Sequence, residues 1–178
     1  MKIWTKILSF NLLLLIGLNA SAVITDDAIY RKMNIPQLDQ PTVMGYLNQF
    51  NKSIVGDKDG KPIPAIFFLV YTNKIKSWMT SPFLEVDTDI DRSWFEKIYT
   101  MMDYMAKAKD FIDLAKLNRK QNTKEYKEAV ANFTLAFQRF NDLLKHPTEV
   151  PAKKMEKLRK EKNDWLKKTR EKLEKQNK

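Results

Sequence analysis

Three aspartates alternate at Asp87, Asp89 and Asp91, a spacing that resembles the start of a calcium-binding loop. In an EF-hand loop the sixth residue is glycine and the twelfth is glutamate. Counted from Asp87, these two positions hold Arg92 and Ile98, so the pattern is broken twice. We therefore interpret the three carboxylates as capping groups of solvated turns and predict no metal site there.

The other side chains with chemical potential are one histidine and a cluster of methionines. His146 has Asp142 one helical turn before it, but a histidine at a helix end more often interacts with the helix dipole. Met101, Met102 and Met105 offer thioethers to copper, yet at helical spacing methionine is an ordinary core residue. Without cysteine or a second histidine, zinc sites and thiol chemistry are excluded.

Glycine-rich motifs that hold phosphates or dinucleotides, and the elbow around a serine nucleophile, do not occur in the sequence. The chain has only 4 glycines, so a phosphate cradle of backbone amides is not favoured either. We predict no catalytic residue, no metal and no cofactor, and therefore a protein that is not an enzyme.

Residues 1–22 have the pattern of a cleavable signal peptide. Two lysines precede the apolar run Ile7–Leu18, and small residues at Ala20 and Ala22 favour cleavage before Val23. The apolar run is shorter than the roughly 18–20 residues that normally span a bilayer. We expect a periplasmic or secreted protein, with no lipid anchor because cysteine is absent.

Two long helices with a continuous apolar stripe are the clearest elements of the sequence, and they predict an all-α fold. The first extends from Asp91 to Leu117, with Asp91 or Ser93 as its cap, and the second ends near Leu144 after a cap at Thr123. The short polar connection between them requires an antiparallel hairpin at the centre of a small helix bundle. The predicted core stripe of the first helix consists of Trp94, Ile98, Met101, Met105, Ala108, Ile112 and Ala115.

The N-terminal half has weaker patterns. For Ile66–Tyr71, β-branched and aromatic residues favour a strand, whereas a start at Pro64 and the lack of a partner strand favour a helix to Met79, which we predict. The other expected elements are helices over Asp26–Met33 and Pro41–Ile54, a turn over Gly56–Pro62, and an acidic loop over Glu85–Asp91.

The net charge of +10 is concentrated at the C-terminus. Residues 151–178 hold 12 basic and 5 acidic residues, a net charge of +7, whereas residues 23–150 hold 18 and 17, a net charge of +1. We divide the mature chain at this boundary into a helical bundle domain, 23–150, and a basic helix, 151–178. That helix has a thin apolar stripe, and acid-to-base pairs at i,i+4 support it, such as Glu156–Lys160, Asp164–Lys168 and Glu171–Lys175.

The basic helix is the candidate partner-binding element, with a solvated helical face as the alternative. Its predicted partner is another envelope protein or an anionic surface of lipid headgroups or cell-wall polymer. Within residues 151–178 lysine outnumbers arginine ten to two and aromatic residues are scarce, which disfavours nucleic acid as the partner. The candidate binding residues are Lys153, Lys154, Lys157, Arg159, Lys160, Trp165, Lys167, Lys168 and Arg170.

The sequence thus favours an exported, non-enzymatic binding protein of the bacterial envelope: an adaptor, a chaperone-like binder or an assembly factor. The alternative is a secreted membrane-active effector or toxin, whose helical hairpin would open and insert its apolar seams. A third and weakest hypothesis is a hydrolase that uses carboxylates such as Asp87, Asp89 or Glu96. The oligomeric state stays open at this point.

Overall fold

The computed structural model describes residues 24–55 and 63–176, and within these residues the chain is all-α. The predicted signal peptide and the predicted turn over Gly56–Pro62 lie outside the described residues. Apart from one isolated β-bridge between Ile90 and Glu149, the described part contains helices, turns and connections. The helices are α2 (Asp26–Lys32), α3 (Gln40–Val55), α4 (Ala65–Met79), α5 (Leu84–Thr88), α6 (Arg92–Leu117), α7 (Lys124–Lys145) and α8 (Ala152–Gln176).

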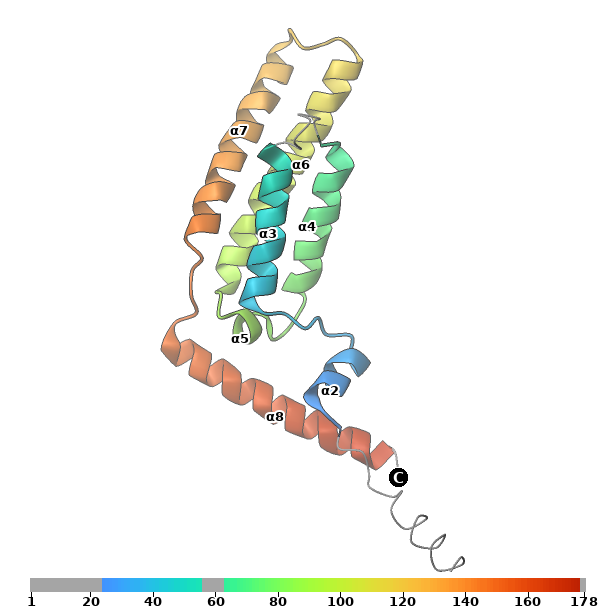
Figure 1. Ribbon diagram of the computed structural model, residues 1–178, viewed down its shortest axis with the longest axis vertical. Helices are drawn as coiled ribbons and strands as arrows, with labels where there is room; N and C mark the ends of the chain where they lie inside the picture. Colours follow the sequence, from blue (N-terminus) through green and yellow to red (C-terminus); the bar gives the residue numbers. More distant parts are fainter. Residues whose placement is uncertain (1–23, 56–62, 177–178) are drawn as a thin grey trace, which may run out of the picture.

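Helices α3, α4, α6 and α7 form an up-and-down bundle in which each is antiparallel to its neighbour in sequence (Figure 1). The predicted helical hairpin is therefore confirmed as α6 and α7, and the segment Ile66–Tyr71 is helical as predicted. With 26 and 22 residues, α6 and α7 are longer than α3 and α4, and they extend beyond the ends of these helices (Figure 1).

The bundle core is rich in aromatic residues. Trp94 is fully buried, and its indole N–H donates to the backbone carbonyl of Leu143 at 2.9 Å, which ties α6 to α7. The Phe50 ring lies 5.5 Å from the Phe68 ring and 5.4 Å from the Phe140 ring, both in edge contacts that aromatic pairs favour. Three bundle helices, α3, α4 and α7, thus meet around Phe50.

Helix α8 crosses the lower end of the bundle and packs against α5 and α2 instead of projecting into solvent (Figure 1). It completes a second, smaller apolar cluster of Ile29, Tyr30, Phe83, Leu166 and Leu173. The α6–α7 hairpin therefore does not form the main support of α8.

Local chemistry explains the helix starts. The side chains of Thr25 and Thr123 accept from the backbone N–H groups of Ala28 and Tyr126, as expected of N-caps. At the start of α6 the cap is Asp91, whose carboxylate accepts from the Ser93 N–H at 2.9 Å. The prediction of an acidic loop over Glu85–Asp91 was wrong for its first half, because Leu84–Thr88 forms the short helix α5.

Candidate partner-binding surfaces

The acidic segment before α6 is the binding site for α8 within the molecule. Lys154 on α8 donates to Glu85 at 2.8 Å and to Asp91 at 2.9 Å. The hydrogen bond from Lys154 to Asp91, together with those from Ser93, holds the pKa of the Asp91 carboxyl well below its usual range. The hydrogen bonds to Asp91 and Glu85 raise the pKa of Lys154 above its ordinary value.

About two turns beyond Lys154 on α8 lies the most buried ion pair of this contact. Lys162 donates to Asp87 at 2.6 Å, and the two side chains are only 21% and 6% exposed. The Lys162 ammonium also lies 5.4 Å from the centre of the Tyr30 ring. Burial opposes the charge of Lys162, but its hydrogen bond to Asp87 and its closeness to Tyr30 outweigh burial and raise its pKa.

Two arginines complete the attachment of α8. Arg159 lies 3.4 Å from the Asp89 carboxylate, and Arg170 pairs with Asp26 and donates to the Ile24 carbonyl at 2.9 Å. Near Lys162, the Trp165 ring lies 5.1 Å from the Phe83 ring in an edge contact. The candidate binding residues Lys154, Arg159, Trp165 and Arg170 are therefore engaged in holding α8 to the body.

The remaining five candidates, Lys153, Lys157, Lys160, Lys167 and Lys168, are exposed on the outer face of α8. With Lys172 and Lys175 they make seven exposed lysines that do not pair with the body, and the helix also exposes five acidic residues: Glu156, Glu161, Asp164, Glu171 and Glu174. The outer face thus carries a net charge of +2 from its described residues, much less than the segment's +7. When α8 is packed against the body, its outer face therefore attracts anions only weakly.

The predicted i,i+4 pairs of α8 are not formed. Within the described chain, Glu156–Lys160, Asp164–Lys168 and Glu171–Lys175 are not among the ion pairs within 4.0 Å, whereas Lys157 and Glu161 approach to 3.7 Å. These long side chains are solvated, and an exposed pair contributes little.

The aspartate triplet is explained by the same contact. Asp87, Asp89 and Asp91 each pair with a different cation of α8, so the prediction of purely solvated turns was wrong for Asp87. Among the described residues no three His, Asp or Glu side chains are grouped as metal ligands would be. Charge pairing with α8 accounts for the positions of these carboxylates.

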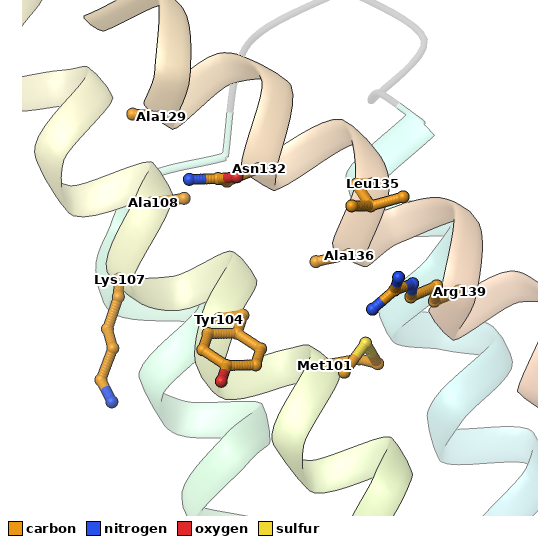
Figure 2. A pocket seen from close by; sticks show the side chains of 9 residues that line it. All are labelled: Met101, Tyr104, Lys107, Ala108, Ala129, Asn132, Leu135, Ala136 and Arg139. Carbon is orange, nitrogen blue, oxygen red and sulfur yellow. The ribbon is translucent and has the colours of Figure 1, made fainter. Parts of the chain in front are cut away.

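An open groove between α6 and α7 is a candidate site that the sequence did not predict (Figure 2). Its volume is about 500 Å³. In Figure 2 the Arg139 side chain reaches from α7 toward Met101 on α6. The lining residues are Met101, Tyr104, Lys107, Ala108, Ala129, Asn132, Leu135, Ala136 and Arg139.

The floor of the groove, which we call the α6–α7 groove, is narrow and apolar. Met101 and Ala108 on α6 are seven residues apart, as are Ala129 and Ala136 on α7. Of the predicted core stripe, Met101 packs against the edge of the core and, like Ala108, is only half-buried, whereas the neighbouring Met102 is fully buried. The small alanines between larger side chains were the signal in the sequence that could have indicated a groove.

Exposed apolar side chains border the groove. Tyr104 is 57% exposed and Leu135 is 46% exposed, on opposite sides of the floor. Lys107 at the rim is held by Asp103 at 2.6 Å, a contact that raises the pKa of Lys107. A groove with an apolar floor and polar rim is the usual form of a site for a partner helix.

A separate exposed apolar surface lies at the start of α4. Ile66, Phe67, Leu69 and Val70 are all exposed, while Phe68 between them is buried in the core. From Ala65 to Asn73 this helix contains no charged residue. Such a concentration of exposed apolar side chains is typical of surfaces that bind other molecules.

Comparison with protein-family models, with curated proteins and with solved structures finds no match to this chain. In the part of the chain that the structure describes, no helix is long and apolar enough to cross a membrane.

Proposed function

We propose that this chain is an exported, non-enzymatic binding protein of the bacterial envelope, an adaptor, chaperone-like binder or assembly factor, whose α6–α7 groove receives an amphipathic helix of a partner protein. The observation that carries the proposal is the groove itself, with its floor of Met101, Ala108, Ala129 and Ala136. Two positions seven residues apart on each helix match the repeat of a third helix packed along them.

The groove has the properties that helix binding requires. Alanine on the floor lets a helix backbone approach closely, and exposed Tyr104 and Leu135 offer apolar surface to its flanks. Arg139 and Lys107 stand at the rim, where they can contact polar groups of the partner without being fully desolvated. Helix-in-groove binding therefore uses both the apolar and the cationic side chains of the groove.

Helix α8 has a smaller role in partner binding than the net charge of +7 in residues 151–178 indicated. Four of its cations are matched by carboxylates of the body. The five exposed candidate lysines remain proposed as an auxiliary contact that accelerates encounter with an acidic partner, an effect that salt weakens.

The test compares partner capture from envelope extracts by the wild-type chain and by variants at exposed positions. Leu135→Glu and Tyr104→Glu place a carboxylate in the groove, and capture should fall at least about tenfold. Val70→Glu, an equally exposed apolar position on α4, is the matched control and should capture normally. Equal loss in groove and α4 variants, or no loss in either, contradicts the proposal.

Removal of α8 is a poor test of its binding role. A chain ending at Val150 would expose Ile29, Tyr30 and Phe83, which α8 covers, and would change the body as well as the charge. Replacement of Lys153, Lys160 and Lys167 by Gln leaves the docked face unchanged. If these lysines are the main docking element, this variant and not the groove variants will lose the partner.

A second candidate function is the membrane-active effector, and the exposed apolar residues Ile66, Phe67, Leu69 and Val70 favour it. In this function α4 would enter a bilayer and the bundle would open. Release of a dye from anionic vesicles tests it, with Val70→Glu as the variant that should reduce release. Intact vesicles at micromolar protein contradict it.

A further inference from the structure

The far end of the bundle is a cationic turn, which we call the hairpin tip and define as residues 114–124. It comprises the last turn of α6, the connection and the first residue of α7. In Figure 1 it extends beyond the ends of α3 and α4 and lies at the opposite end of the bundle from α8. No other described helix covers it in this view.

The charge of the hairpin tip has one sign only. It carries four basic residues, Lys116, Arg119, Lys120 and Lys124, and no acidic residue between Leu114 and Lys124. All four basic residues are exposed. Lys124 approaches Glu128 at 3.5 Å, and within the described chain the other three are not in ion pairs within 4.0 Å. Three cations of the hairpin tip, Lys116, Arg119 and Lys120, therefore face solvent outside any ion pair within 4.0 Å among the described residues.

Two leucines stand among these cations. Leu117 is 80% exposed, the highest exposure among the large apolar residues of the described chain, and Leu114 is 57% exposed. Exposed leucines next to lysines with long apolar stems form an amphipathic end: the leucines can enter an apolar layer while the ammonium groups stay at its polar boundary.

The turn that presents these side chains is closed by hydrogen bonds. The Lys120 N–H donates to the Ala115 carbonyl at 2.8 Å, and the Arg119 N–H donates to the Lys116 carbonyl at 3.1 Å. This pair of bonds is the Schellman pattern, with Arg119 in the left-handed conformation at φ 55°. The tip is consequently preorganised, so binding does not have to order it.

We propose that the hairpin tip binds the surface of an anionic lipid bilayer, with Leu114 and Leu117 entering the interface and the four cations contacting headgroup phosphates. This surface is distinct from the α6–α7 groove, and it holds the bundle upright on a membrane without opening it. Charge complementarity supports lipid, because each cation near an anionic surface adds to binding. Nucleic acid is less suited to the tip, which offers no aromatic side chain for base stacking.

The experiment is sedimentation of the chain from Val23 onward with vesicles of phosphatidylcholine alone and with phosphatidylglycerol added. This form contains all described residues and omits the apolar leader, which would itself bind vesicles. The tip-charge variant replaces Lys116, Arg119, Lys120 and Lys124 by Gln, and the tip-apolar variant is Leu114→Gln with Leu117→Gln. The matched control replaces four α8 lysines by Gln: Lys153, Lys157, Lys160 and Lys167.

We expect the wild-type chain to bind anionic vesicles and to bind neutral vesicles at least about tenfold more weakly. Each tip variant should lose at least about tenfold in binding to anionic vesicles, while the α8 control and the groove variant Leu135→Glu bind as the wild type does. Circular dichroism should show the same helical content for all of them, since every changed residue is exposed.

Three results overturn the proposal. The first is equal loss in the tip-charge variant and the α8 control, which would mean that any four cations serve. The second is wild-type binding by the tip-apolar variant, because an interface-inserting tip needs its leucines. The third is binding to a single-stranded oligonucleotide but not to anionic vesicles, which would assign the tip to nucleic acid. Failure here leaves the groove proposal standing, because the groove variants are tested on a different partner.

Discussion

Lys162 on α8 lies 2.6 Å from Asp87 on α5 and 5.4 Å from the centre of the Tyr30 ring on α2. One ammonium group thus connects the three helices at the lower end of the bundle. Because both charged side chains are largely removed from solvent, loss of one partner leaves the other poorly solvated. The attachment of α8 therefore depends on this pair more than on any exposed pair of the helix.

Lys162→Met should lower the free energy of unfolding by about 1–3 kcal/mol, because it leaves the Asp87 carboxylate without its main partner. The matched control is Lys157→Met, which breaks the exposed pair with Glu161 and should cost less than about 0.5 kcal/mol. Urea unfolding followed by helical circular dichroism measures both. Similar midpoints for the two variants would show that α8 is held by its apolar contacts alone.

Asp91 makes the contact with α8 sensitive to acid. The hydrogen bonds from Lys154 and Ser93 lower its pKa, so its carboxylate stabilises the folded state fully above the ordinary value near 3.8 and less as the pH falls further. The free energy of unfolding should therefore decline below about pH 5. Asp91→Asn, which retains a good N-cap residue, should make this decline shallower. An unchanged slope in urea titrations from pH 3 to 7 would contradict this assignment.

Tyr46 gives the opposite dependence at high pH. Burial, with the neighbouring Tyr71 as a smaller cause, raises its pKa to about 12. A raised pKa means that the neutral phenol stabilises the fold below about pH 10, and this contribution is lost as the pH rises toward 12. Tyr46→Phe should remove one phenolate from the last phase of an absorbance titration at 295 nm. A final phase of unchanged amplitude would show that Tyr46 ionises earlier.

Arg119 should be replaceable by glycine with a gain in stability. Its φ of 55° lies in the left-handed region, which glycine adopts without the Cβ penalty. Arg119→Gly should raise the free energy of unfolding by about 0.5–1 kcal/mol, since relief of strain exceeds the added entropy of the unfolded chain. Asn118→Gly is the control: its φ is −88°, and its side chain donates to the Leu114 carbonyl at 3.0 Å, so the change should destabilise. Thermal unfolding would contradict the assignment if both substitutions shifted the midpoint in the same direction.

The long helices were predictable because their stability is local. In α6 and α7 the apolar spacing is regular and the caps Asp91 and Thr123 are adjacent in sequence to the helices they start. Helix α5 was not predictable, because five residues are too few to show a period. The short segment is instead fixed by burial of Leu84 and Thr88 against the rest of the fold.

The candidate sites were harder to predict from the sequence, because they depend on contacts between residues that are far apart along the chain. Lys162 and Asp87 are 75 residues apart, and a helix of mixed charge gives no sign of which cations meet carboxylates. The groove was missed for a subtler reason: Met101 and Ala108 do follow the apolar period, but the α6 core face is rotated toward Met102. The predicted core stripe of α6 therefore includes residues that lie half-buried at the edge of the core.

The most direct test of the proposed helix binding in the α6–α7 groove is photocrosslinking in envelope extracts from a reactive residue at Leu135, with the crosslinked peptide identified by mass spectrometry. We expect one partner segment with apolar residues at i, i+3 or i+4 and i+7, obtained from position 135 and lost when Tyr104→Glu is added. The same reactive residue at Lys160 on α8 should not capture that segment. Capture of the segment from position 160 but not from 135 would exclude the groove as its binding site and assign partner binding to the basic helix.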